Sequence, residues 1–447
     1  MPMPSDQVQM YGSAELEALM VRGVHLPAPH LVAIARDVPL EAIAPGAVLH
    51  PFTRLSGART RIDAGAVLGE GGAATVHDSW VGAQAEVATL GPVTMKQVTL
   101  GPRGLLGCGV AEDAVFLGRE APEPGFTTGY GFRVRRGSLY EEDANSAQHT
   151  DTKMTILFPW VTLGSNINWC DILVAGGTGP QTGNFSEIGS GAVHFNFSPR
   201  GDKASATVLG DVTAGVFLDQ ARVFIGGNSS LVGPLRGAFG AVSPAGGRMQ
   251  RDLRKGMNLG APPPQESSVF DLEVYGSIHR LYTTQVRMIG QLAALDGWYG
   301  HIRAWLARGD SDRTERFARG RAVVQSNLRE RVTQLTALAE RIEDSVRVLE
   351  AREPSDPRLD QHRAFLTHWP ALEGRLLEFD RNVIEPPPEL TGDLERQAER
   401  HGESYTRTIQ ALSPQAVDAG RKWLEMIAAS VATQEVLAAV PQVQRSL

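Results

Sequence analysis

A short polar loop in the middle of the sequence has the residue types needed to bind an anion. Arg200 and Lys203 lie three residues apart in SPRGDK, and Lys153 adds a further positive charge upstream. Guanidinium and ammonium groups hold phosphate or pyrophosphate through charge-assisted hydrogen bonds. We therefore expect a local positive patch on this otherwise acidic protein, and we expect it to bind a phosphorylated group.

The strand before this loop carries a histidine that could move a proton. His194 lies two residues before Asn196 in VHFNF, so strand alternation places both side chains on one side. A neutral imidazole can accept a proton from an attacking group. His149, just upstream of Lys153, is a second candidate. A lone histidine in such a strand is also commonly a stacked or hydrogen-bonded residue, and both interpretations stay open.

Several amide side chains and a glycine-rich loop precede this strand. The loop AGGTGPQTGN, residues 175–184, could form an anion-binding nest with its backbone N–H groups. It lacks the GK[ST] ending of a phosphate-binding P-loop. The amide candidates for substrate contact are Asn166, Asn168 and Asn184. Asparagine ladders and glycine corners also occur in repetitive β-structures for purely structural reasons.

A six-residue repeat indicates which elements must position these side chains. Ile43, Leu49 and Leu55 are six apart, and Val81, Val87 and Val93 repeat the spacing beside Gly and Ala. This period predicts a β-solenoid in which each unit forms one side of a triangular coil and its aliphatic residue points inward. The repeat fades over residues 119–152, which we interpret as a loop or hairpin leaving the coil, and returns at 153–259.

The sequence after Gly260 is typical of helices. Leu328, Leu335, Ile342 and Leu349 are seven apart, with Val332, Ala339 and Val346 between them, which predicts a coiled-coil seam of about three heptads. Ser413-Pro414 is a typical helix start. These patterns predict an N-terminal lead-in (1–40), repeat coils (41–118), the inserted segment (119–152), a β-helix continuation carrying the site (153–259), a proline-rich linker (260–268) and an all-α bundle or coiled-coil domain (269–447).

Composition limits the classes of protein to consider. The 447 residues have a net charge of −7, are 42% hydrophobic and 21% charged, and include two cysteines. This balance gives no sign of nucleic-acid or membrane binding, and the cysteines have no metal-ligand spacing. No signal peptide or apolar run of membrane-spanning length is visible. We expect a cytoplasmic protein without a metal site.

Two segments resemble a known family. VFIGGNSSLVGPLRGAFGAVSPAGGRMQRDL and EIGSGAVHFNF are similar to the acetyltransferase domain of the bifunctional UDP-N-acetylglucosamine pyrophosphorylase/glucosamine-1-phosphate N-acetyltransferase family. The resemblance covers roughly residues 40–255. It implies a left-handed parallel β-helix, a homotrimer, acetyl-CoA as co-substrate, and a sugar phosphate or nucleotide sugar as ligand.

The resemblance also assigns residues by position. It implies that Asn196 contacts the amino-sugar phosphate, that Phe197 replaces a tyrosine there, and that Lys203 corresponds to a basic substrate-loop residue. The residues that it places at acetyl-CoA are Gly227, Ala245 and Arg251.

Two departures from the family pattern keep several functions open. No nucleotide-binding loop precedes Ile43, so we do not expect uridyl transfer. The coil that carries the family's catalytic histidine has none here, which leaves His194 as the substitute base. The chain is therefore either an acetyl-CoA-dependent N-acetyltransferase of an amino-sugar phosphate, or a non-catalytic protein that binds a nucleotide sugar or acts as a scaffold, with the helical domain binding a protein partner. A purely structural solenoid is the third alternative.

Overall fold

The computed structural model describes residues 9–120, 125–203, 205–260, 270–378, 384–402 and 404–442. The chain folds as two compact units, Met1–Asn168 and Trp169–Leu447. The fold class is the expected one, a left-handed parallel β-helix followed by helices. Apart from Gly260, the linker predicted at 260–268 lies outside the described residues.

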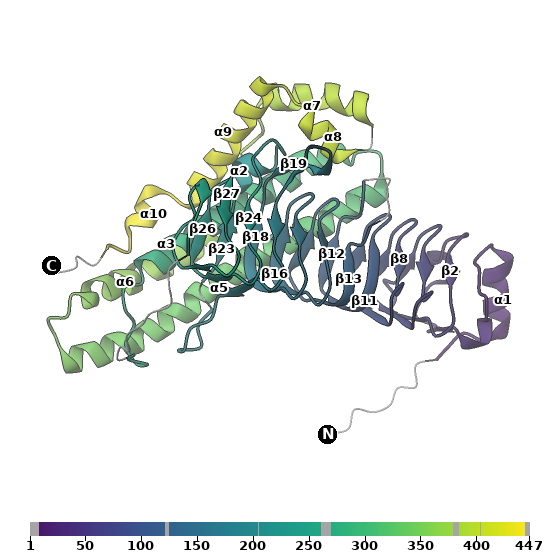
Figure 1. Cartoon of the computed structure of the whole chain (residues 1–447), viewed down its shortest axis with the longest axis horizontal. Coiled ribbons are helices and arrows are strands. Elements are labelled where there is room, and N and C mark those ends of the chain that lie inside the picture. The colour runs from purple at the N-terminus through teal and green to yellow at the C-terminus, as the bar shows by residue number, and fades with distance from the viewer. Residues whose placement is uncertain are drawn as a thin grey trace. The chain divides into compact units, whose positions relative to one another are not determined.

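The first unit is built from stacked coils of short parallel strands (Figure 1). Leu49 pairs with Leu68, Leu68 with Val87, and Val87 with Leu106, and all four side chains are fully buried. Each coil in this column is therefore 19 residues long, which is three six-residue sides plus one residue. The predicted inward stacking of the aliphatic repeat is confirmed.

The elements of the first unit follow one another with short turns. They are α1 (Ser13–Val21), η1 (Pro29–Leu31), β1 (Ala33–Ile34), η2 (Leu40–Ala42), β2 (Val48–Leu49), β3 (Arg54–Ser56), β4 (Arg61–Ile62), β5 (Val67–Leu68), β6 (Ala74–His77), β7 (Trp80–Val81), β8 (Glu86–Val87), β9 (Val93–Lys96), β10 (Thr99–Leu100), β11 (Leu105–Glu112), β12 (Ala114–Phe116), β13 (Thr128–Val134), β14 (Ser138–Tyr140), β15 (Asn145–Ser146), β16 (Asp151–Leu157) and β17 (Thr162–Leu163).

Residues 119–152 differ from the expected loop or hairpin. β13 pairs in parallel with β11, β14 with β12, and β15 with β17, so these residues continue the coils. The aliphatic period is hidden because several inward positions hold other residue types. Thr128 pairs with Leu106, Tyr140 with Phe116, and Ser146 with Leu163, and all three are buried. Residues 121–124 of this segment are outside the described residues.

The second unit begins with further coils, which carry longer excursions. Leu231 pairs with Met249 18 residues later, whereas His194 pairs with Leu231 37 residues later, because extra segments intervene between those coils. The elements are β18 (Asn168–Val174), β19 (Gly177–Gly179), η3 (Pro180–Thr182), β20 (Asn184–Phe185), β21 (Glu187–Ile188), β22 (Val193–Phe195), β23 (Thr207–Leu209), α2 (Val212–Gly215), β24 (Phe224–Ile225), β25 (Ser230–Val232), β26 (Leu235–Gly237), β27 (Ala241–Ser243), β28 (Arg248–Met249) and β29 (Gly256–Met257).

Glycine at the coil corners allows consecutive coils to approach closely. A Cβ on Gly226 would lie 2.3 Å from the backbone nitrogen of Ala245 in the next coil. Real side chains do not fit at that distance, so the small residues that flank the repeat are required by the stacking.

The same unit contains the helical region. Its elements are α3 (His279–Gly297), a π-helical turn η4 (Trp298–Arg303), α4 (Ala304–Leu306), α5 (Ser311–Arg352), α6 (Arg358–Leu377), α7 (Pro388–His401), α8 (Tyr405–Gln410), α9 (Pro414–Val431) and α10 (Gln434–Ala438). Helix α5 spans 42 residues and packs on α6 and α3. All seven seam residues named from the sequence are buried, which confirms the heptad prediction.

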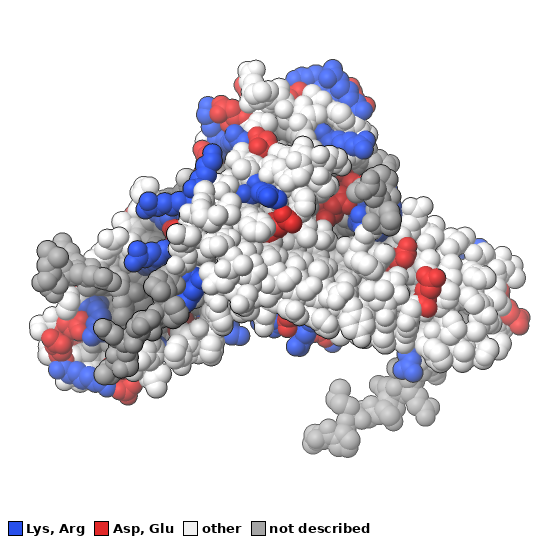
Figure 2. All heavy atoms as spheres, viewed as in Figure 1, with Lys and Arg blue, Asp and Glu red and all other residues white. Residues whose placement is uncertain are grey.

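Helix boundaries follow local backbone chemistry. Ser413 caps α9 by accepting a hydrogen bond from the N–H of Ala416, as its place before Pro414 predicts. Helix α7 ends before α8 begins, because Gly402 adopts a φ of 61° that a continuing helix does not allow. Lys, Arg, Asp and Glu gather over α6, α7 and α9 on the face seen in Figure 2, whereas the coils there carry few charges.

Candidate functional site

Along β22 and the two residues after it, polar side chains point inward and aromatic side chains point outward. His194 and Asn196 are buried, as the predicted alternation requires, whereas Phe195 and Phe197 are 50% and 62% exposed. His194 pairs with Leu231 in the next coil, so the imidazole occupies a position that an aliphatic residue fills elsewhere. The candidate base thus lies inside the solenoid core.

Both ring nitrogens of His194 have partners inside the protein. Nδ1 lies 2.5 Å from the carbonyl oxygen of Cys170, and Nε2 lies 2.8 Å from the hydroxyl of Thr207. A carbonyl can only accept, so Nδ1 carries the hydrogen and Nε2 accepts from Thr207. Burial lowers the pKa of His194 to about 4, against the smaller opposing effects of the Cys170 carbonyl and Asp171. The imidazole is neutral at pH 7, and the lone pair on Nε2 already accepts the hydrogen bond from Thr207.

Asn196 belongs to a buried charged network with the helical region. Its amide donates to one oxygen of Asp171, and Arg331 of α5 donates to the other. The side chains of Arg331 and Asp171 are only 1% and 6% exposed. Asp171 adopts a φ of 61° within β18, which turns its carboxylate into this position. A helix side chain therefore enters the region where the resemblance implies substrate contact.

The loop that follows β22 also contacts the helical region. Asp202 accepts hydrogen bonds from the hydroxyls of Ser198, at 2.6 Å, and Tyr275, at 2.9 Å. Burial and the nearby Asp202 carboxylate raise the pKa of Tyr275 to about 12. Arg341 of α5 donates to the backbone oxygen of Arg200 at 2.8 Å. These contacts fasten the loop to the segment before α3 and to α5.

Arg200 itself is held by the same segment. Its guanidinium donates to the carbonyl oxygens of Asp271 and Val274 and lies over the rings of Phe270, at 4.4 Å, and Tyr275, at 4.7 Å. Hydrogen bonds and cation–π contacts together fix a side chain that we expected to face a ligand. Lys203, in contrast, is exposed.

Asn184 has a structural position in the glycine-rich loop. Its amide nitrogen donates to Thr178 and to the carbonyl of Gln220, both at 3.1 Å, and its oxygen accepts from the N–H of Arg222 at 2.9 Å. These bonds join the β19–β20 ribbon to the next coil. Both the nitrogen and the oxygen of the Asn184 side-chain amide are therefore bonded to protein groups.

The remaining substrate candidates belong to the first unit. Asn166, in a turn with a φ of 58°, and Asn168, at the start of β18, are exposed. Lys153 lies in β16 and lines a cavity of about 280 Å³ with other charged residues, Lys96, Glu112, Asp113, Arg135 and Arg136. The structure thus brings Lys153 together with three cations and two carboxylates of its own unit.

The three cofactor candidates lie on the last coils. Gly227 is half-buried, at a corner, and Ala245 and Arg251 are exposed. No hydrogen bond or ion pair joins Arg251 to another described residue. The side chains are therefore accessible in a single chain, and nothing in their geometry identifies a cofactor.

The residues that sequence reasoning did not find are those contributed by the helical region. Arg331 flanks the heptad seam of α5, and Arg341 follows ten residues later among many other arginines. Tyr275 lies just after the linker, in a segment that the sequence predicts as helix. Nothing in the local pattern separates these side chains from solvated ones, because their partners are far away in the sequence.

Comparison with known proteins gives no family for this chain. No protein-family model matches it, and no curated protein matches it. Within the described part of the chain, no helix is long and apolar enough to cross a membrane, and no cluster of three or more His, Cys, Asp or Glu residues could hold a metal ion.

Proposed function

We propose that this protein is a non-catalytic solenoid scaffold and not an acyltransferase. The observation that carries the proposal is that His194 is buried with both ring nitrogens bonded, beside a buried network of Asn196, Asp171 and Arg331. Asn196, which the resemblance places at the sugar phosphate, here belongs to the bonds that hold α5 against the coils. The positive loop that suggested a phosphate site is bound to the protein's own helical region.

The chemistry of acetyl transfer needs groups that this arrangement does not offer. A general base must reach the attacking amine with a free lone pair, and the pKa of the best base lies near the working pH. His194 directs its lone pair to Thr207, and its pKa is about 4. A phosphate at the loop would have to displace the contacts of Arg200 with Asp271 and Val274.

Assembly is the activity that such a scaffold would perform. The aromatic rings of Phe195 and Phe197 face outward on a solenoid side, where a second copy could cover them. The family resemblance implies a homotrimer through the β-helix, and these rings are suited to such an interface. We expect light scattering to give three times the chain mass, and the double variant Phe195→Ser/Phe197→Ser to give one chain mass. A monomeric wild type would contradict this part of the proposal.

Acetyl-CoA, glucosamine-1-phosphate and UDP-N-acetylglucosamine are the probes that the resemblance supplies. We expect no release of coenzyme A when the full chain is incubated with acetyl-CoA and glucosamine-1-phosphate and free thiol is measured. Thiol release that falls in both His194→Gln and Arg251→Ala would overturn the proposal. Calorimetry with UDP-N-acetylglucosamine distinguishes a scaffold that binds a nucleotide sugar from one that does not. A heat of binding that is present in the wild type and absent in Lys203→Ala would make the protein a nucleotide-sugar sensor.

A further inference from the structure

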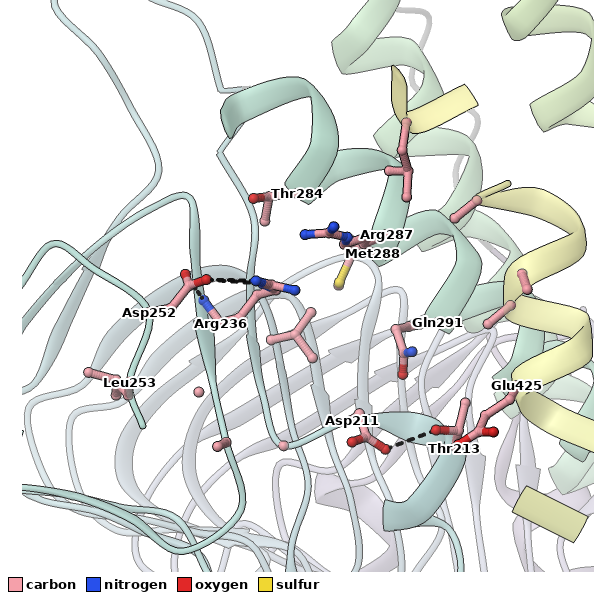
Figure 3. Close-up of a pocket in the computed structure, with 18 residues that line it drawn as sticks. Asp211, Thr213, Arg236, Asp252, Leu253, Thr284, Arg287, Met288, Gln291 and Glu425 are labelled. Carbon is pink, nitrogen blue, oxygen red and sulfur yellow. Dashed lines mark hydrogen bonds and ion pairs between the residues drawn. The ribbon is translucent and has the colours of Figure 1, made fainter. Parts of the chain in front are cut away.

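The second unit contains a cavity of about 510 Å³ (Figure 3), and none of its lining residues belongs to the candidate site described above. Its walls come from β23, α2 and β26 of the solenoid and from α3, α9 and α10 of the helical region. Pockets that hold small molecules have volumes of roughly 300–1,000 Å³, so this one is large enough for a ligand. Small residues make the space, namely Gly210, Gly237, Ala238, Ala428, Ala429 and Ala432.

One cation in this pocket has no hydrogen-bond or ion-pair partner among the described residues. Arg287 of α3 lines the cavity, and no hydrogen bond or ion pair joins its guanidinium to an acceptor in the described ranges. Partial burial, and next the like charge of Arg236, lower its pKa, while Asp252 opposes this effect. Arg287 is exposed, so its guanidinium is open to a ligand, and an anion beside it would supply both a counter-charge and a hydrogen-bond acceptor.

The neighbouring charges favour an anion at this end. Asp252 accepts from Arg236 at 2.9 Å and from Arg280 at 3.3 Å, so two arginines already share its carboxylate. Arg236 and Arg287 line this wall together with Asp252, and Arg280, which is not a lining residue, pairs with the same carboxylate, so positive charges outnumber the one negative charge here. Figure 3 shows Arg236 and Arg287 on the same side of the cavity as Asp252.

The side-chain amide of Gln291, next to Arg287 on α3, could donate a second hydrogen bond to the anion. The Oε1 of Gln291, one helical turn after Arg287, accepts from the N–H of Val212 at 2.6 Å. This bond fixes the side-chain amide and leaves the hydrogens on Nε2, for which no acceptor is found in the described part of the chain. Two donors thus lie one turn apart on one face of α3.

The rest of the wall is largely apolar. Met288, Leu253 and Leu437 line it together with the alanines of α9. Asp211 caps α2 by accepting from the N–H of Ala214 at 2.8 Å, so its carboxylate is used locally. The exposed carboxylate of Glu425 lies near Thr213, away from Arg287 (Figure 3).

We propose that this pocket binds a small organic anion that has a carboxylate or phosphate monoester attached to an apolar body. Arg287 holds the anionic group, Gln291 donates to it, and Met288, Leu253 and Leu437 contact the apolar body. The proposal is independent of whether the protein has acyltransferase activity.

The test is a fluorescence titration of the full chain with 1-anilinonaphthalene-8-sulfonate, followed by displacement with decanoate, decyl phosphate and inorganic phosphate. We expect saturable binding of the dye and displacement by the two decyl compounds, of which the stronger identifies the anionic group. Inorganic phosphate should compete at least about tenfold less well, because it lacks the apolar body. Equal competition by inorganic phosphate would overturn the apolar part of the proposal.

Variants connect the signal to the pocket. Arg287→Gln should weaken dye binding about tenfold or more, since it removes a charge-assisted contact. Ala429→Trp, at an exposed position of α9, should abolish binding by filling the cavity. The matched control Arg329→Gln, at an exposed position of α5, should leave binding unchanged.

Two results would overturn the assignment. The first is dye binding as tight in Arg287→Gln and Ala429→Trp as in the wild type, or no binding of dye or decyl compounds at all. The second concerns Glu425→Gln, which should leave anion binding unchanged or strengthen it because a like charge is removed. Weaker binding of the dye and the decyl compounds in Glu425→Gln would overturn the placement of the anionic group beside Arg287.

Discussion

The buried ion pair between Arg331 and Asp171 gives a quantitative test of how α5 is held. Side-chain exposures of 1% and 6% mean that both charges are almost completely removed from water. Removing one partner of such a pair leaves an uncompensated buried charge and typically destabilises a protein by about 3–5 kcal/mol. We expect that loss of unfolding free energy in Arg331→Met.

The reciprocal change is Asp171→Asn, which keeps a residue type that tolerates the φ of 61° at this position. It too should destabilise by about 3–5 kcal/mol, because Arg331 then remains buried without its counterion. The double variant removes both charges and should lose less than the sum of the two singles, by about 2–3 kcal/mol. Arg329→Met, two residues from Arg331 and exposed, is the control and should change stability by less than about 0.5 kcal/mol.

Urea titration followed by tryptophan emission measures these effects, because the fully buried Trp169 lies two residues before Asp171 in β18. The free energy of unfolding comes from the transition in which this emission changes. A loss below about 1 kcal/mol in either single variant would mean that water reaches the pair. Strict additivity in the double variant would show that Arg331 and Asp171 do not stabilise one another. Either result would refute the network as the anchor of α5.

Three further predictions concern the same unit. Burial lowers the pKa of His194 from 6.5 to about 4, so the unfolded state takes up its proton first as the pH falls. Stability should decrease by about 3 kcal/mol from pH 6.5 to pH 4, and His194→Gln should flatten this part of the urea-derived pH profile. Gly226→Ala should destabilise by about 1–3 kcal/mol or more through collision with the next coil, while Gly276→Ala, which meets nothing within 4 Å, should not, as thermal melts will show. Tyr275→Phe removes the hydrogen bond to Asp202 and should lower the unfolding free energy by about 1–2 kcal/mol; an unchanged urea midpoint would argue against that bond.

The proposed scaffold and the proposed anion pocket involve different parts of the second unit. The scaffold depends on the core network around His194 and on the outward aromatic rings of β22. The pocket depends on Arg287 and on the spacing between α3 and the last coils. Each can fail without the other, since none of the variants used for the pocket touches the network.

The repetitive elements could be predicted from the sequence because their physics is local. A six-residue period with small residues at the corners determines a triangular coil, and the column Leu49, Leu68, Val87 and Leu106 stacks as that period requires. A seven-residue period likewise determines the seam of α5, all of which is buried. Where Thr128, Tyr140 and Ser146 replace aliphatic residues at inward positions, the pattern is lost although the coil continues.

The environment of the candidate site was decided by the tertiary structure alone. The sequence placed His194 and Asn196 on one side of a strand, but the alternation does not state which side is the core, and the apolar Phe195 and Phe197 suggested the opposite choice. Cys170 and Thr207 provide the partners of the buried His194, and Arg331, 160 residues away from Asp171, brings the charge that compensates the carboxylate beside Asn196. The charge and direction of a side chain are local properties, whereas its partner, its pKa and its access to a ligand depend on elements that only folding brings together.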